Sequence, residues 1–104
     1  MKVNIKSTRF ELTDAISDYI QEKVDMLDKF LGNLPVINCD FEVEKTTGHN
    51  KGEVFRAEIN IQVPKKLFRV EKVETDLYKA IDKVKDHVAE MIIEAKKKIN
   101  DKRK

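Results

Sequence analysis

Apolar and polar residues alternate in four stretches of the chain, at residues 2–7, 36–45, 53–63 and 67–73. An alternation with a period of two places successive side chains on opposite faces of an extended strand. Each stretch therefore predicts a β-strand with one apolar face and one polar face. The apolar positions are Val3 and Ile5 in the first stretch, Ile37, Cys39, Phe41 and Val43 in the second, Phe55, Ala57, Ile59, Ile61 and Val63 in the third, and Phe68 and Val70 in the fourth.

Two further stretches carry apolar residues at steps of three and four, the spacing of one face of an α-helix. The first begins after Thr13 and Asp14, which suit an N-cap and a first turn, and it ends before Gly32 and Pro35. The second begins at residues 75–76 and is the longest predicted element. The apolar positions are Ile16, Ile20, Val24, Leu27 and Leu31 in the first helix, and Leu77, Ile81, Val84, Val88, Ile92, Ala95 and Ile99 in the second.

These patterns predict the element order β-α-β-β-β-α. A helix between the first two strands favours a parallel pair joined by a right-handed crossover, and the two hairpins that follow favour antiparallel pairs. The polar strand faces require both helices to cover the opposite face. We therefore expect an α/β two-layer sandwich, a four-stranded mixed sheet with two helices on one face. At 104 residues, the chain predicts one domain over residues 1–100 and a frayed basic tail at residues 101–104.

The composition excludes several classes of protein. No apolar run approaches the roughly 18 residues of a membrane span, and the opening residues carry acids and no signal-peptide core. We therefore expect a cytoplasmic protein without a membrane partner. The single cysteine, Cys39, cannot form an internal disulfide, and two histidines are too few for a Cys/His zinc cluster, so neither a disulfide scaffold nor a metal site is expected.

The sequence offers no constellation for catalysis. Neither glycine-rich phosphate motif occurs, and Cys39 shares its predicted strand face with apolar residues, where a thiol is usually a small buried hydrophobe. Asp40, Glu42 and Glu44 fit solvated strand acids better than a metal or acid–base pair. His49 lies in a turn-rich loop, where a surface histidine and an RNA contact are both open. We expect no enzyme, no cofactor and no small-molecule substrate.

Basic residues concentrate in the second half of the chain. Residues 1–52 hold 7 basic and 9 acidic side chains, whereas residues 53–104 hold 14 and 10. On the last helix Lys79, Lys83 and His87 follow at steps of four and form a ridge that could touch consecutive phosphates. Lys96, Lys97 and Lys98 form a second basic cluster near the end. The alternative is an ordinary solvated face, because acids interrupt the helix and its dipole also favours cations at the C-terminus.

Several segments together resemble one family. They are TDAISDYIQEKVDMLDKFL at residues 13–31, FRAEINIQVPKKLFRVEKVETDLYKAIDKV at residues 55–84, and within the latter the string DLYKAID at residues 76–82. The last string is the most specific, since helical amphipathicity does not require its Asp-x-Tyr-x-Ala-Ile-Asp combination. The chain resembles the ribosome hibernation-promoting factor family, which includes ribosome-associated inhibitor A and the sigma-54 modulation proteins.

The resemblance implies a fold like that of double-stranded RNA-binding domains and a role without catalysis. Members of the family bind the small ribosomal subunit across the messenger RNA channel and the transfer RNA sites, and so block translation in resting cells. Steric occlusion would be the mechanism, with a monomer as the expected state. The positions that correspond to RNA-facing basic residues are Lys23, Lys79 and Lys83, with Arg56 and Arg69 as weaker candidates.

Two departures from the family pattern change this expectation. His87 and Glu90 stand where members of the family commonly carry Lys or Arg, so contact would move toward Lys96, Lys97 and Lys98. The chain ends soon after the last helix, which resembles a short form without the second domain that pairs ribosomes. Two other functions stay open: a homodimeric interaction module using the apolar spot at residues 91–93, or a general binder of double-stranded RNA. Tyr78 is expected either to pack at the helix edge or to stack on a base.

Overall fold

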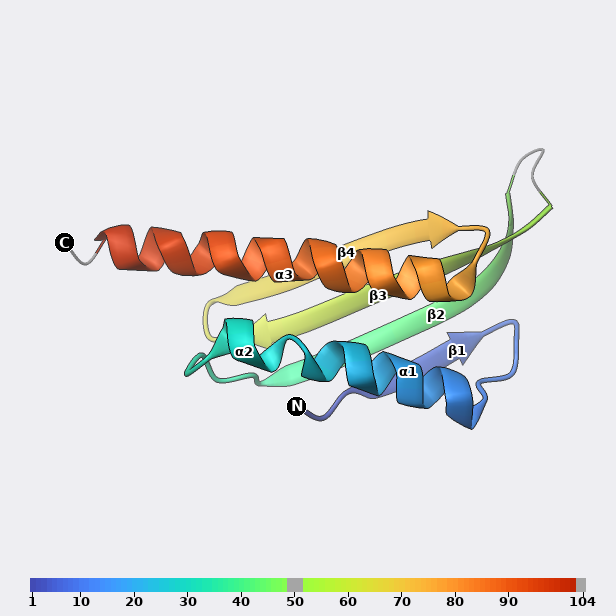
Figure 1. The fold of residues 1–104 in the computed structure, drawn as a ribbon, viewed down its shortest axis with the longest axis horizontal. Helices are drawn as coiled ribbons and strands as arrows, with labels where there is room; N and C mark the ends of the chain where they lie inside the picture. The colour runs from blue at the N-terminus through green and yellow to red at the C-terminus, as the bar shows by residue number, and fades with distance from the viewer. Residues whose placement is uncertain (49–51, 103–104) are drawn as a thin grey trace.

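The four strands form one sheet, and all the helices lie on one side of it (Figure 1). The computed structural model describes residues 1–48 and 52–102, so His49 lies outside the described residues. The elements in chain order are β1 (Asn4–Thr8), α1 (Asp14–Asp25), α2 (Asp28–Leu31), β2 (Asn38–Gly48), β3 (Gly52–Val63), β4 (Lys66–Glu74) and α3 (Leu77–Lys102). The predicted α/β sandwich is confirmed.

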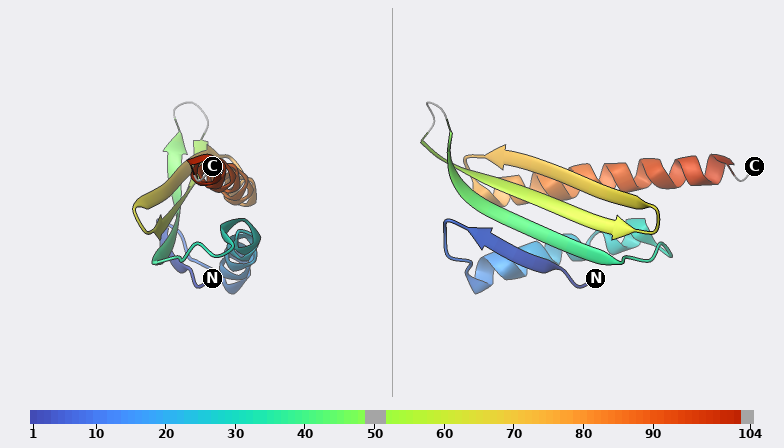
Figure 2. Two further views of the ribbon diagram at one scale, coloured as in Figure 1. Left: turned by 90° about the vertical axis from the view of Figure 1, so that its left-hand side faces the viewer. Right: turned by 180° about the vertical axis from the view of Figure 1, so that it is seen from behind.

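The sheet has the strand order β1-β2-β3-β4. β1 and β2 run parallel, with Asn4 opposite Asp40, while β2–β3 and β3–β4 are antiparallel hairpins. Because α1 and α2 connect the parallel pair, they lie over β1 and β2, whereas α3 follows the last hairpin and lies over β3 and β4 (Figures 1 and 2). The mixed sheet predicted from the connections is therefore confirmed.

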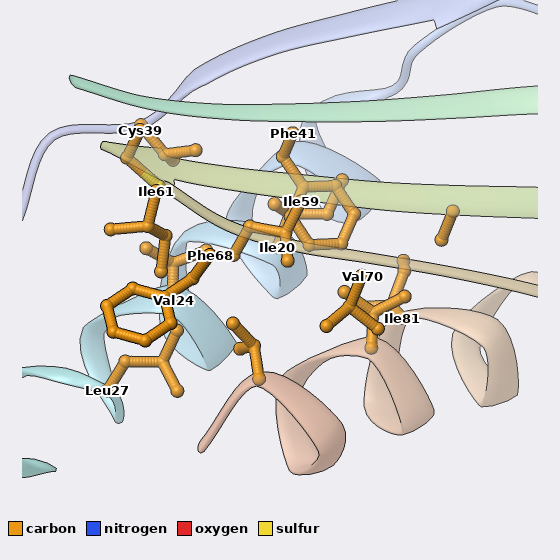
Figure 3. Close-up of a cluster of buried hydrophobic side chains, with 14 of the residues drawn as sticks. Ile20, Val24, Leu27, Cys39, Phe41, Ile59, Ile61, Phe68, Val70 and Ile81 are labelled. Carbon is orange, nitrogen blue, oxygen red and sulfur yellow. The ribbon is translucent and has the colours of Figure 1, made fainter. Parts of the chain in front are cut away.

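The core lies between the sheet and the helices (Figure 3). Phe41, Ile59 and Phe68 from the strands are 1% exposed or less, and so are Ile20 and Ile81 from the helices. Alternation along the strands supplies one side of this layer, and the helix stripes supply the other. Apolar burial of this kind contributes about 25 cal/mol for each Å² removed from water, which is the main favourable term in folding.

Two details differ from the predictions. The first helix is divided in two, because the Leu27 N–H bonds to the Val24 carbonyl at 3.0 Å, a tight turn that ends α1 before α2 begins. Leu27 and Leu31 still reach the core. Ile37, expected on the dry face, is 65% exposed because it precedes β2 at the end of the sheet.

The last part of α3 projects beyond the sheet, as the views from the front and from behind show (Figures 1 and 2). Ile92 is fully buried, whereas Ile93, Glu94, Lys97 and Lys98 are exposed. α3 continues to Lys102, so two of the four residues expected to fray are helical, and residues 103–104 lie outside the described part. In the described residues, every helix is too short or too polar for a membrane span.

The fold predicts that truncating two isoleucines of the sheet region will change the free energy of unfolding by very different amounts. Ile59→Ala should lower the free energy of unfolding by about 2–5 kcal/mol, because it opens a cavity in the packed layer. Ile37→Ala removes the same atoms from an exposed position and should change it by less than about 0.5 kcal/mol. Urea unfolding followed by circular dichroism measures both values, and similar losses for the two variants would contradict this packing.

Candidate nucleic-acid interface

The predicted basic ridge lies on the outer side of α3. Lys79, Lys83 and His87 are all exposed, and their spacing of four places them on neighbouring turns. Lys79 forms no ion pair within the described residues, while the Lys83 ammonium is bonded to the Glu74 carboxylate of β4. The ridge thus presents one free cation and one whose charge is already balanced.

A shallow depression of about 360 Å³ lies beside this ridge, between α3 and β4. Lys72, Lys83 and His87 line it together with Asp86 and Glu90. Lys72 was absent from the residues predicted from the sequence. The alternation along β4 could have predicted its position. It continues from the buried Phe68 and Val70 to Lys72, and so places Lys72 on the helix side of the sheet.

Lys23 lies between the two long helices. Its ammonium is 3.5 Å from the Asp82 carboxylate of α3 and 5.1 Å from the centre of the Tyr19 ring. The Lys23 side chain is only 21% exposed. Lys23 stays a predicted RNA contact, but most of its side chain is covered and its charge is balanced by Asp82 in the contact between α1 and α3.

Two tyrosines complete this contact between the helices. The Tyr19 hydroxyl donates to Asp82 Oδ1 at 2.5 Å, and the Tyr19 and Tyr78 rings meet edge to face, with centres 4.7 Å apart. The hydrogen bond to Asp82, followed by burial, raises the pKa of Tyr19 to about 12. Tyr78 both packs at the helix edge and remains 42% exposed.

Arg56 lies on the sheet face opposite the helices, within a group of four carboxylates. It is bonded to Glu42, lies 3.1 Å from Glu58 and 3.6 Å from Glu71, and also contacts Glu44. Burial by itself would lower the pKa of Arg56, but these carboxylates raise it overall. With a side chain 17% exposed, Arg56 acts in this structure as the centre of an ion-pair network across three strands.

The open sheet face is acidic as a whole. Arg69 is 64% exposed there, 3.5 Å from Glu58. The charged side chains of this face are Lys6, Asp40, Glu42, Glu44, Arg56, Glu58, Arg69 and Glu71. Among the described residues of this face, five carboxylates thus outnumber three cations. Strand alternation places Arg56 and Arg69 on the sheet face away from the helices, and so on the opposite side of the sheet from the α3 ridge. Figure 2 shows the sheet and the helices as two separate layers.

The second basic cluster lies on the projecting part of α3. Lys96 is half-buried, and its ammonium reaches Gly32 at the end of α2, 3.0 Å from where a Cβ would stand. Lys97 is 3.6 Å from Glu94, and Lys98 is exposed. The cluster is therefore a second cationic patch on α3, separated from Lys79 and Lys83 by the exposed acids Asp86, Glu90 and Glu94.

The outer surface of α1 has the opposite charge. Asp14, Asp18 and Glu22 follow at steps of four, and Asp25 comes one turn later, all exposed. A polyanion would be repelled by this surface and attracted to α3. The helix layer thus has a basic half, on α3, and an acidic half, on α1.

Nothing in the described residues adds a reactive group. Cys39 is 1% exposed, and desolvation by burial raises the pKa of its thiol to about 12. An inert thiol of this kind packs as a small apolar side chain. In residues 1–48 and 52–102, no three His, Cys, Asp or Glu side chains converge in a way that could hold a metal ion.

The contact between Tyr19 and Asp82 predicts the ionisation of Tyr19. In a Tyr78→Phe background Tyr19 is the only tyrosine, and its phenolate absorbance should appear near pH 12. Adding Asp82→Asn removes the acceptor and the negative charge, so the pKa should fall toward about 10. Because the pKa is raised, the associated stability is present below pH 10 and lost as pH rises through about 12.

Asp86→Asn is the matched control for this titration, since Asp86 lies on the same helix with its side chain 67% exposed and pairs with Lys85. The pKa of Tyr19 should be the same with and without this change. If Asp82→Asn leaves the pKa of Tyr19 unchanged, or if both variants change it equally, the contact between Tyr19 and Asp82 is contradicted.

The chain was compared with known proteins. Its residues 3–100 match the model of the family described as "Sigma 54 modulation protein / S30EA ribosomal protein". A ribosome hibernation promotion factor of Lactococcus lactis is 29% identical over 108 residues, which cover 98% of this chain and 53% of that protein. Another of Staphylococcus aureus is 28% identical over 102 residues, covering 98% and 52%. The chain therefore spans about half the length of these curated relatives.

Two solved structures share the fold. The N-terminal domain of Thermus thermophilus Protein Y superposes with a TM-score of 0.71 at 30% identity, covering 90% of this chain and 98% of that one. A ribosomal subunit interface protein of Coxiella burnetii gives a TM-score of 0.75 at 12% identity, with coverage of 92% and 98%, and supports the fold alone. With a family match over nearly all of its residues, the chain belongs to the sigma 54 modulation protein / S30EA ribosomal protein family.

Proposed function

We propose that this chain binds the small ribosomal subunit through the basic half of its helix layer and holds ribosomes in an inactive, hibernating state. The observation that carries the proposal is the family match over residues 3–100, together with relatives named ribosome hibernation promotion factors. The proposal includes a cytoplasmic location and a role without a catalytic step, in keeping with the names of these relatives.

The charge distribution supports ribosomal RNA as the immediate partner. Lys79 and Lys98 are exposed cations without an ion pair among the described residues, and they lie at the two ends of the described α3 surface. Lys83 and Lys97 could exchange their carboxylate partners for phosphates, since exposed pairs are worth only about 0–1 kcal/mol. The acidic surfaces of α1 and the open sheet would be repelled by RNA, so α3 is the part that faces it.

The predicted contacts therefore differ in the charge they can offer. Lys79, Lys83 and the cluster at residues 96–98 lie on α3 and act together. Lys23 can contribute at the border between the helices, where Asp82 already balances it. Arg56 and Arg69 stay predicted contacts only for a partner that reaches the open sheet face, and Arg56 would first have to leave its carboxylates.

Steric occlusion is the mechanism that fits a domain of this kind. Several phosphate contacts would hold a packed sandwich, 51 × 28 × 19 Å along its principal axes, in the space that transfer RNA and messenger RNA require. No covalent bond changes in this mechanism. Inhibition then follows occupancy and ends when the protein dissociates.

The two alternative functions remain as outcomes of the same experiments. Ile93 is 36% exposed on α3, but Ile92 is buried and Met91 packs against the core, so the apolar spot offered for a homodimer is small. A general binder of double-stranded RNA should bind plain duplexes as tightly as small subunits.

Charge reversal on α3 tests the interface. Lys79→Glu with Lys83→Glu should weaken co-sedimentation with small subunits about a hundredfold near 0.1 M salt, because each phosphate contact contributes roughly one decade there. The matched control is Lys65→Glu with Lys66→Glu, the same charge change at the exposed β3–β4 turn. The control should bind within about threefold of the unmodified protein. Equal losses in both variants would mean that only net charge matters, and an unchanged α3 variant would exclude this surface.

Salt dependence tests the phosphate contacts themselves. With about five contacts, log K for small subunits should fall against log salt with a slope of roughly −3.5 to −4.5. Lys79→Gln should make the slope shallower by about 0.7–0.9, since it removes one contact without introducing a negative charge. Filter binding at four or more salt concentrations measures both slopes, and a flat dependence would contradict electrostatic binding.

A further inference from the structure

Tyr78 is an aromatic side chain at the surface that the fold holds in one orientation. It lies in the first turn of α3, where its backbone N–H donates to Asp76 Oδ1 at 2.8 Å, and the residue is 42% exposed. Its hydroxyl makes no hydrogen bond to any group in residues 1–48 or 52–102. A tyrosine whose role was only packing would usually be more buried, with its hydroxyl paired.

The support for this ring comes from the neighbouring helix. Tyr19 meets the Tyr78 ring at an interplanar angle of 88° with centres 4.7 Å apart. Tyr19 in turn is held by its hydrogen bond to Asp82 and by the Lys23 ammonium near its ring. These contacts restrict Tyr78 before any ligand binds, which lowers the entropic cost of stacking against it.

The charges around Tyr78 favour a particular ligand. Lys79 follows it in the chain, exposed and unpaired among the described residues, and Lys83 lies one turn further along. Two carboxylates close to Tyr78 in the chain are already engaged, Asp82 with Lys23 and Asp76 with the first N–H groups of α3. An exposed aromatic ring beside lysines is typical of surfaces that stack unpaired bases and bind the adjoining phosphates.

We propose that Tyr78, supported by Tyr19 and flanked by Lys79, is a stacking site for an unpaired nucleobase of RNA. The inference rests on the proposed function, because it takes RNA as the partner of α3. It adds a requirement that phosphate contacts alone do not impose: the bound RNA must present a base outside a duplex. The site thereby distinguishes single-stranded or looped RNA from a continuous double helix, whose bases are stacked inside.

Substitution at position 78 tests the stacking directly. Tyr78→Phe keeps the ring and should bind small subunits within about threefold of the unmodified protein. Tyr78→Leu keeps an apolar side chain without a ring and should bind roughly 5- to 150-fold more weakly, the range expected for loss of one stacked base. The salt slope should be unchanged in both variants, because neither removes a cation. Tyr78→Leu binding as tightly as Tyr78→Phe would overturn the proposal.

A second measurement uses the unmodified protein, so its result does not depend on whether Tyr78→Leu folds. Tetranitromethane should nitrate Tyr78 in the free protein and much more slowly in the complex with small subunits. Added N-acetyltyrosinamide serves as the reference, because the raised pKa of Tyr19 keeps its phenol protonated and unreactive. Equal nitration of Tyr78 in the free and bound protein would overturn the stacking site. Loss of binding in the variant with both Lys79→Glu and Lys83→Glu, alongside full binding by Tyr78→Leu, would refute stacking and leave the proposed function intact. Failure of the unmodified protein to bind small subunits would refute both.

Discussion

The burial of a single sheet face beneath the helices is the constraint on which the rest of the structure depends. Phe41, Ile59 and Phe68 can leave water only if Ile20 and Ile81 cover them, so α1 and α3 must lie side by side on that face. Every polar side chain is then assigned to one of two outer surfaces. The open sheet face is acidic, whereas the helix layer has a basic half on α3 and an acidic half on α1, although the core between the two layers is uniformly apolar.

The two outer surfaces use their charges differently. On the open sheet, pairing of β2, β3 and β4 brings Glu42, Glu58 and Glu71 around Arg56, and this network stabilises the sheet at the expense of an available cation. On α3, most lysine side chains extend outward from a helix whose other side is buried. The Lys79 ammonium is therefore available to a partner, whereas the Arg56 guanidinium is already paired with carboxylates of the sheet.

The border between α1 and α3 joins stability to recognition. Asp82 accepts a hydrogen bond from Tyr19 and balances Lys23, and these contacts link the two helices above the core. The same contacts support the exposed Tyr78 ring at the start of α3. Mixed polar and aromatic contacts suit this position, because the border is half-exposed and the polar groups of Tyr19, Lys23 and Asp82 pair with one another there.

The strands, the long last helix, the sheet topology and the ridge of Lys79 and Lys83 were predictable from the sequence, because periods of two and of three to four depend on neighbours along the chain. The tertiary structure decided which charges remain available. Lys23 meets a carboxylate 59 positions away, and Arg56 meets carboxylates from two other strands, contacts that depend on helix placement and strand register. The division of the first helix at Leu27 was likewise not predictable, since no glycine or proline marks it in the sequence.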